Sequence, residues 1–261
     1  MLKYLKQRLT RSYLGQFYAK YRDINTYKKK YALFLDDLAD FEKFSSSAVS
    51  RFGTDKISLN PELDDKISNT PIEPHYTYHP AWAARILAQT KPVKHVDISS
   101  TLHFCTIVSA FVPVDFYDYR PANLRLDNLN SDHADLTKLF FGDNSIQSLS
   151  CMHTIEHIGL GRYGDTIDYD GDIKAIGELK RVLAPNGDLL IVTPTGKPKI
   201  EFNAHRIYSH DQIIEYFSPL KLMEFSLVPD QFENTGIVRN ATKELADKQD
   251  WGCGCFWFKK I

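Results

Sequence analysis

Short apolar runs alternate with amphipathic segments over most of the chain, from residue 94 onward. A strand is predicted wherever an apolar run is bounded by turn residues, and a helix wherever apolar positions recur every three or four residues. The predicted strands cover residues 96–99, 114–119, 146–152, 188–193, 220–229 and 255–259. The predicted helices cover 101–111, 173–183 and 211–217, and a poorly defined third element covers 124–129. This alternation predicts a parallel α/β sheet, and the lack of an evident helix between the last two strands predicts an antiparallel hairpin at one edge.

The first part of the chain has a different pattern. Residues 1–45 have helical periodicity, clearest over 31–44, whereas residues 45–70 are rich in Ser, Gly, Asn and Pro and predict a loop. A further helix is expected to open near Pro80 and to end by Pro92. We therefore predict a helical N-terminal extension with its loop over residues 1–75 and an α/β domain over residues 76–261.

Composition excludes several classes of protein. The net charge of −1 argues against general nucleic-acid binding, which usually requires a basic excess. No apolar run approaches the roughly 20 residues that span a bilayer, and the N-terminus lacks the apolar stretch of a secretory signal. Four Cys in a chain of 261 residues do not indicate a disulfide framework. A cytoplasmic protein is expected.

Residues 1–30 carry a local excess of Lys and Arg with aromatic residues between them. One interpretation is a helix that contacts a membrane surface or a protein partner. The other is an extension whose aromatic face packs on the core while its basic face stays solvated, and we favour it because aromatic residues at helical spacing are usually buried.

The most polar turn of the chain follows the strand at 146–152. The segment LSCMHTIEHIGLGRYGD (149–165) leads toward ELKRVLAPNGDLLIVTP (178–194), which predicts a βαβ unit with its polar residues at the carboxyl end of the first strand. Open parallel sheets bind ligands at that edge. The sequence therefore predicts the position of its own functional site.

The same turn contains an HxxEH pattern, formed by His153, Glu156 and His157. On a helix the two His would share a face and could bind a metal, with Glu156 beside them, as in a metal-dependent hydrolase. The strand directly before the motif and the lack of a third ligand disfavour this interpretation. We predict a hydrogen-bonded His pair and no metal, and we expect Cys253 and Cys255 to be two small buried residues.

Other predicted strand ends carry carboxylates. Asp97 lies in the first strand, before a donor-rich turn at residues 99–101 whose amides could face an anionic or polar ligand. Asp118 closes the second strand, where one carboxylate can accept hydrogen bonds from two ribose hydroxyls, although a turn cap is the alternative. Asp135 could accept from a purine amino group or could instead cap a helix.

Two polar loops are expected at the same edge of the sheet. The first contains Gly159, Gly161 and Gly164 around Arg162, Tyr163 and Asp165, and the second contains Asn203, His205 and Arg206. Arg162 and Arg206 could hold a phosphate or carboxylate through forked hydrogen bonds, or could form surface salt bridges.

The run LSCMHTIEHI followed by ELKRVLAPNGDLLIVTP resembles class I S-adenosylmethionine-dependent methyltransferases. HVDIS at 95–99, IEHIGLGRYGD at 155–165 and FNAHRIYS at 202–209 are similar to a bacterial domain-of-unknown-function family related to these enzymes. The resemblance covers residues 76–259. It implies a Rossmann-like methyltransferase fold with a mostly parallel seven-stranded sheet and an antiparallel edge hairpin. It also implies a role near surface-polysaccharide and sugar-modification pathways.

The resemblance assigns cofactor contacts residue by residue. It implies that S-adenosylmethionine is bound by Asp97 and Ser99 in the loop after the first strand, by Asp118 at the ribose, by Asp135 at the adenine and by His153 where donor and acceptor meet. The chain departs from the family at DISSTLHF, which has no glycine. Side chains at residues 99–101 would crowd a close approach of the cofactor to the backbone.

Transfer of a methyl group to a hydroxyl requires an aligned acceptor and a base. Three residues are candidate bases, with His157 favoured: His157, Asp165 and His205. Five residues are candidate acceptor contacts: Glu156, Arg162, Tyr163, Asn203 and Arg206. We expect a methyltransferase acting on a sugar, nucleotide-sugar or related small polar acceptor. The alternatives are a non-catalytic sugar- or nucleotide-binding module on a decayed methyltransferase fold and the metal-dependent hydrolase.

Overall fold

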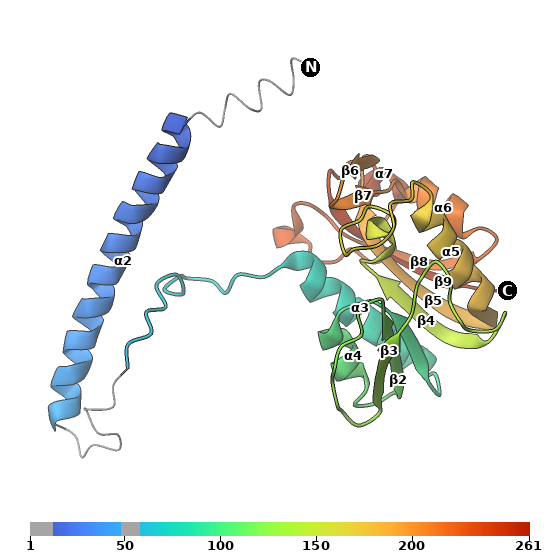
Figure 1. Ribbon diagram of the computed structural model, residues 1–261, viewed down its shortest axis with the longest axis horizontal. Helices are drawn as coiled ribbons and strands as arrows, with labels where there is room; N and C mark the ends of the chain where they lie inside the picture. Colours follow the sequence, from blue (N-terminus) through green and yellow to red (C-terminus); the bar gives the residue numbers. More distant parts are fainter. Residues whose placement is uncertain (1–12, 48–57) are drawn as a thin grey trace. The chain divides into compact units, whose positions relative to one another are not determined.

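The computed structural model describes residues 13–47 and 58–261, and it divides into two compact units, residues 1–71 and 72–261. In the first unit, the helix predicted over 1–45 is present as α2, Tyr13–Ser47, and the part of the prediction before residue 13 lies outside the described residues (Figure 1). Ion pairs of Lys30 with Asp64 and of Lys66 with Asp37 connect this helix to the stretch that follows it. Among the described residues, no helix has both the length and the apolarity needed to cross a membrane.

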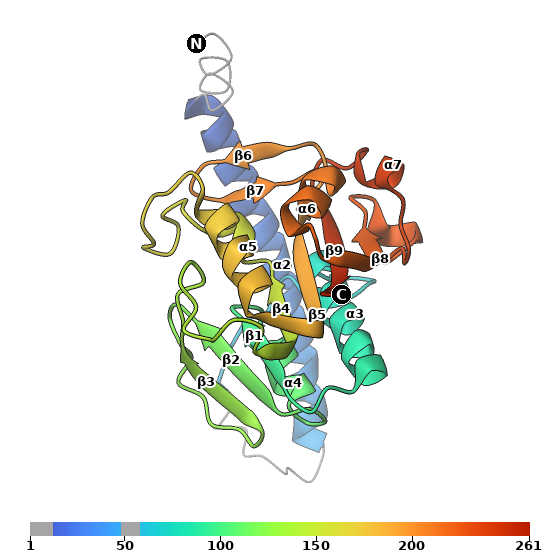
Figure 2. The same ribbon diagram turned by 90° about the vertical axis from the view of Figure 1, so that its right-hand side faces the viewer.

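The second unit contains a seven-stranded sheet in the order β3-β2-β1-β4-β5-β9-β8 (Figure 2). Strands β1 to β5 run parallel, and β9 lies antiparallel between β5 and β8. The strand bounds are His95–Ile98 (β1), Val114–Asp118 (β2), Leu129–His133 (β3), Ile146–Met152 (β4), Leu183–Thr195 (β5), Lys221–Val228 (β8) and Gly252–Lys259 (β9). The predicted fold class, a mostly parallel seven-stranded sheet with antiparallel strands at one edge, is confirmed.

The antiparallel strands are not joined by a tight hairpin. Between β8 and β9 the chain passes through residues 229–251, which contain a 3₁₀ turn, Phe232–Asn234, and the short helix α7, Lys243–Ala246. Helices this short give no periodic signal, which is why the sequence predicted a direct connection. A second, two-stranded sheet of β6, Lys199–Glu201, and β7, His205–Ile207, was also not predicted.

Helices cover both faces of the large sheet (Figure 2). Helices α5, Gly171–Val182, and α6, His210–Phe217, pack on one face, and α3, Pro74–Thr90, and α4, Leu102–Val108, pack on the other. Consecutive residues of β5 divide between the two layers, with Ile191 in the first core and Val192 in the second. A strand buried on both faces reads as a continuous apolar run, and this explains why the sequence signal was strong there.

Helix α3 begins at Pro74, six residues before the expected start near Pro80. Pro74 occupies the first helical position, where a missing N–H costs nothing, and the Glu73 side chain accepts a hydrogen bond from the Tyr76 amide at 2.6 Å. Pro80 lies inside the helix. The earlier start places His75 and His79 on the buried side of the helix.

A chain of buried polar groups connects β1 to β4. Ser150 Oγ donates to Asp97 Oδ2, so its oxygen accepts from His95 Nε2 at 2.8 Å. The other ring nitrogen of His95 then accepts from Ser148 Oγ, also at 2.8 Å. Every member of this chain is buried and hydrogen-bonded, which is the condition under which a polar group stabilises a core.

Burial lowers the pKa of His95 to about 3, against about 6.5 in an unfolded chain. Between these values the unfolded chain binds the extra proton, so the stability contributed by neutral His95 is present above about pH 6.5 and is lost as the pH falls toward 3. We expect His95→Gln to have a shallower fall in unfolding free energy with decreasing pH, by up to about 1.4 kcal/mol per pH unit between about pH 6 and 4. Urea unfolding of both proteins across this range measures the difference.

Asp97 contributes with the opposite sign, because burial raises its pKa to about 6 and this contribution is lost as the pH rises toward that value. It is present in both proteins, so the comparison isolates His95. Equal pH slopes for the two proteins would show that His95 is not held neutral by the fold.

Candidate functional site

A cavity of about 350 Å³ lies at the carboxyl ends of β1, β2, β3 and β4. Its walls come from the turn at residues 99–101, from 118–120 after β2, from 134–137 after β3 and from 152–168 after β4, with Tyr76 of α3 also in the lining. The volume falls in the range of about 300–1,000 Å³ found for small-molecule pockets. The polar residues predicted at separate strand ends are therefore gathered around one cavity, at the edge where parallel sheets bind ligands.

The turns after β1 and β4 share an uncommon backbone conformation. Ser99 has a φ of 58° and His153 a φ of 55°, both in the left-handed region that non-glycine residues rarely occupy. Surrounding hydrogen bonds fix both turns: the Ser99 amide donates to Tyr117 O at 2.7 Å, and the His153 amide donates to Val192 O at 2.8 Å. Thr154 Oγ1 donates to Ser99 O at 3.0 Å and joins the two turns directly.

The three side chains of the glycine-free turn are bonded to the protein itself. Ser100 Oγ accepts from the Met152 amide at 3.0 Å, and Thr101 Oγ1 accepts from the Phe104 amide at 3.3 Å as the cap of α4. Ser99 Oγ donates to Tyr117 O at 3.4 Å. The chain thus reaches the conformation of a glycine turn with serine, and the hydroxyls are held by strand and helix groups.

Asp118 and Asp135 both line the cavity, and each uses only one carboxylate oxygen within the protein. Asp118 Oδ1 accepts from the Arg120 amide at 2.7 Å. Asp135 Oδ1 accepts from the amide and hydroxyl of Thr137 at 2.8 and 2.7 Å, in a turn that is not the start of a helix. Among the described residues, neither Oδ2 atom accepts a hydrogen bond. Each residue therefore serves as a turn cap through Oδ1 and has its Oδ2 atom without a hydrogen-bond partner among the described residues.

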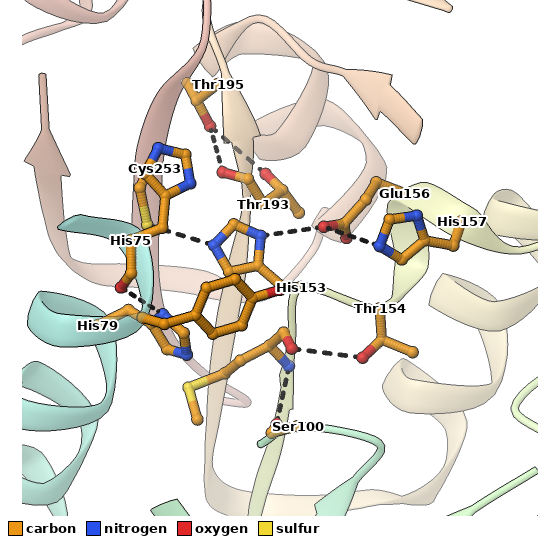
Figure 3. A network of polar contacts seen from close by, with 12 residues as sticks. His75, His79, Ser100, His153, Thr154, Glu156, His157, Thr193, Thr195 and Cys253 are labelled. Atoms are coloured by element: carbon orange, nitrogen blue, oxygen red, sulfur yellow. Dashed lines mark hydrogen bonds and ion pairs between the residues drawn. The ribbon is translucent and has the colours of Figure 1, made fainter. Parts of the chain in front are cut away.

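Glu156 lies between two imidazoles in a short 3₁₀ turn, Ile155–His157 (Figure 3). Its Oε1 accepts from His153 Nδ1 at 3.0 Å and lies 3.8 Å from His157 Nε2, whereas its buried Oε2 has no hydrogen-bond partner in the described chain. His157 Nδ1 is 2.6 Å from Ala204 O and must donate to it, because a carbonyl only accepts. In neutral His157 the lone pair is therefore on Nε2.

The HxxEH residues do not gather as the ligands of one metal. Within residues 13–47 and 58–261, the one group of three possible ligand atoms takes only His153 from this motif and adds His75 and Cys253. The predicted hydrogen-bonded arrangement of the His residues is present, through Glu156 and Ala204. Cys253 and Cys255 are both buried, as expected.

Six predicted site residues do not line the cavity and instead bond to or pack against other parts of the protein: Asp97, Glu156, Arg162, Asn203, His205 and Arg206. Asp97 lies beneath the cavity, where it accepts from the Ser100 amide at 2.9 Å. Arg206 is buried and donates to Ile158 O at 2.7 Å and to Tyr169 O at 3.0 Å. Its guanidinium therefore has no pair of N–H groups available for a substrate anion.

The remaining loop residues also bond mainly to the protein. Asp165 lines the cavity, but its carboxylate accepts from the amides of Gly159 and Tyr163 and organises the loop. His205 stacks on Trp251, with ring centroids 5.8 Å apart, and burial lowers its pKa. Arg162 donates to Ala204 O at 3.2 Å. Asn203 donates to Leu160 O at 3.5 Å.

Tyr76 and Thr154 both line the cavity and are not among the predicted site residues. Tyr76 precedes the helix start expected near Pro80, and only the Glu73–Pro74 capping signal brings it into the helix that borders the cavity. Thr154 lies between His153 and Glu156 in the HxxEH pattern, and its hydroxyl joins the turns after β1 and β4. Its role depends on a contact across 55 residues of sequence, which no local pattern encodes.

Comparison by sequence gives one family and no described activity. A family model described as "Caenorhabditis protein of unknown function, DUF268" matches residues 124–230. The match covers less than half of the chain, and its description names Caenorhabditis where a bacterial family was expected. No protein of curated function matches the chain in sequence.

Solved structures share the fold. The N-methyltransferase NodS from Bradyrhizobium japonicum, solved with S-adenosyl-L-homocysteine, is 13% identical, with 77% of this chain and 91% of that chain covered and a TM-score of 0.50. A putative methyltransferase from Bacillus halodurans is 14% identical, with 69% and 98% covered and a TM-score of 0.49. The 1,6-didemethyltoxoflavin-N1-methyltransferase from Burkholderia thailandensis is 10% identical, with 75% and 93% covered and a TM-score of 0.49. The likeness to NodS, at 13% identity and a TM-score of 0.50, shows the fold alone, which is the Rossmann-like methyltransferase fold.

The left-handed conformation of Ser99 leads to a test of the glycine-free turn. In Ser99→Gly the side-chain penalty at φ 58° disappears, which is worth about 1–2 kcal/mol, while the greater freedom of the unfolded chain offsets about 0.5–1 kcal/mol of it. We expect Ser99→Gly to be neutral or stabilised by up to about 1 kcal/mol, and Ser99→Val to be destabilised by more than that. Urea unfolding of the three proteins measures both effects. A strongly destabilised glycine variant beside a neutral valine variant would contradict a left-handed turn.

Proposed function

We propose that this protein is an S-adenosylmethionine-dependent methyltransferase that acts on a sugar, nucleotide-sugar or related small polar acceptor. The observation that carries the proposal is the cavity at the carboxyl ends of β1, β2 and β4, in which Asp118 keeps one carboxylate oxygen free of protein partners. A single ionised carboxylate at the end of the second strand suits the two vicinal hydroxyls of a ribose. The position of Asp118 supports the proposal because the resemblance to methyltransferases assigns a carboxylate at the end of the second strand to the cofactor's ribose.

The residues of the cavity fit a bound S-adenosylmethionine. In this proposal the turn at 99–101 would hold its amino-acid part, Asp118 would bind the ribose, and Asp135 with the buried Leu136 would bind the adenine; all of these residues line the cavity. The free Oδ2 of Asp135 can accept from an exocyclic amino group, and Leu136 offers an apolar surface to the ring. When bound, this cofactor supplies an electrophilic methyl group.

His157 is the residue we assign as the base. Its Nδ1–H is fixed on Ala204 O, so Nε2 is the atom that can take a proton from an acceptor hydroxyl. The acceptor oxygen would keep the electron pair of its broken O–H bond and form the new bond to the methyl carbon, while the bond from that carbon to the sulfonium sulfur would break and leave its electron pair on sulfur. The Glu156 carboxylate, with Oε1 at 3.8 Å from Nε2, stabilises the imidazolium that results.

The loop beside His157 favours a polar, anionic acceptor. Tyr163 lines the cavity, and the Arg120 and Arg162 guanidinium carbons lie 4.6 and 5.1 Å from the centre of its ring. Arg120 also lines the cavity, so a cationic group borders the acceptor side. This suits the phosphates of a nucleotide-sugar. The sequence resemblance leads us to propose that the reaction belongs to surface-polysaccharide biosynthesis in the cytoplasm. We also propose that the basic N-terminal helix contacts a membrane surface or a protein partner.

Binding of S-adenosylmethionine tests the cofactor half of the proposal. We expect calorimetry to give micromolar-range binding to the wild-type protein and at least about tenfold weaker binding to Asp118→Ala, since a hydrogen bond to a charged group is worth about 1.5–3 kcal/mol. Asp132→Ala is the matched control, because Asp132 lies in β3, just before its last residue, and does not line this cavity. No binding at millimolar cofactor, or equal affinity of the Asp118 and Asp132 variants, would contradict the proposal.

Methyl transfer tests the acceptor half. With methyl-labelled S-adenosylmethionine and a panel of nucleotide-sugars as acceptors, we expect His157→Gln to lower turnover by about 10²–10⁴-fold, because a positioned base contributes that factor. Cofactor affinity should stay unchanged. His103→Gln, an exposed His of α4 outside the cavity, should retain full turnover. Cofactor binding without transfer to any acceptor would instead favour a non-catalytic binding module, and full activity of His157→Gln would exclude His157 as the base.

A further inference from the structure

We propose that His75, His153 and Cys253 form a binding site for a zinc ion. The three residues come from α3, from the turn after β4 and from β9, and all three are buried (Figure 3). One ligand atom from each lies within 4.8 Å of the other two. The proposal goes beyond the methyltransferase function and does not depend on it.

The separation of two of these atoms matches zinc coordination. His153 Nε2 and Cys253 Sγ are 3.5 Å apart. Zinc binds thiolate sulfur at about 2.3 Å and imidazole nitrogen at about 2.0–2.1 Å in tetrahedral geometry, which places such a nitrogen and sulfur about 3.6 Å apart. The two atoms already stand at the distance of two ligands on one ion.

The protein also orients His153 as a metal ligand. Its Nδ1 donates to Glu156 Oε1 at 3.0 Å, which leaves the lone pair on Nε2, facing Cys253 (Figure 3). A carboxylate that holds the far nitrogen of a ligating His is the usual second contact in zinc sites. The left-handed backbone of His153, at φ 55°, is a strained conformation of the kind that proteins retain at functional positions.

The ring of His75 is held in place beside His153. It stacks on His153 with the centroids 5.3 Å apart and packs against Trp251 in a tilted arrangement with the centroids 4.7 Å apart. These contacts restrict its orientation. Metal binding displaces the thiol proton of Cys253 to solvent, so the ion takes a thiolate and two neutral imidazoles.

The donor set selects the metal. Two imidazoles and one thiolate suit zinc, whereas magnesium and calcium prefer oxygen ligands. Three protein ligands leave a fourth position, as in zinc sites that bind water or a substrate atom. His153 also lines the cavity, so the ion would stand at the cavity wall.

The alternative is a thiol–imidazole hydrogen bond with no metal, and the following experiment separates the two. Wild-type protein is produced with zinc in the medium, purified without chelators and analysed by elemental mass spectrometry. We expect stoichiometric zinc, and its loss in Cys253→Ser and in His75→Ala. Cys255→Ala is the matched control: Cys255 is a buried residue of the same strand, 3.9 Å away between sulfurs, but it lies outside the ligand group.

Two further measurements guard against variants that fail to fold. Cobalt(II) added to metal-free wild-type protein should produce a thiolate-to-cobalt charge-transfer band in the near ultraviolet, absent in Cys253→Ser and present in Cys255→Ala. Zinc should raise the thermal midpoint of the wild-type and Cys255→Ala proteins and leave that of Cys253→Ser unchanged. Glu156→Ala should weaken zinc affinity by about 10–100-fold, as expected for a residue that holds a ligand. Wild-type protein that takes up neither metal, or a Cys253→Ser protein that binds as the wild type does, would overturn the site.

Discussion

The carboxylate of Asp97 connects the turn after β1 to the neighbouring strand β4. It accepts from the Ser100 amide, in that turn, and from Ser150 Oγ on β4. Burial raises its pKa to about 6, and the hydrogen bonds oppose that shift. The turn at residues 99–101, which lines the cavity, is therefore held in part by a buried group that does not line the cavity.

The two halves of the cavity are built by different means. On the β1–β2 side the backbone turns form the cavity wall, and Asp118 Oδ2 accepts no hydrogen bond from the described residues. On the side of residues 157–168, charged side chains shape the loop by bonding to main-chain groups, as Arg206 does with Ile158 O and Asp165 with the Gly159 amide. The same charged residue types can stabilise a loop or bind a substrate, so only their contacts in the structure show which of the two they do.

Periodicity in the sequence was sufficient for the main sheet and not for its surroundings. The strands at 146–152 and 188–193 were predictable because burial on both faces gives them uninterrupted apolar runs. The β6–β7 pair has exposed residues on β6 and no such pattern, so it was missed. Asp118 and Asp135 were predictable as residues that close strands or turns. The grouping of His75 with Cys253 was not, because it arises from elements at opposite ends of the second unit.

The position of β9 has a consequence for how the molecule folds. The cavity walls come from the ends of β1 to β4 and the loops after them, from Gly171 of α5 and from Tyr76 of α3, and all of these precede β9 in the chain. Until β9 pairs, β5 presents an unpaired edge and β8 has no neighbour to join. Pairing of β9 closes this edge and brings Cys253 beside His153 in the same event. Completion of the sheet therefore also brings together the three residues of the proposed zinc site.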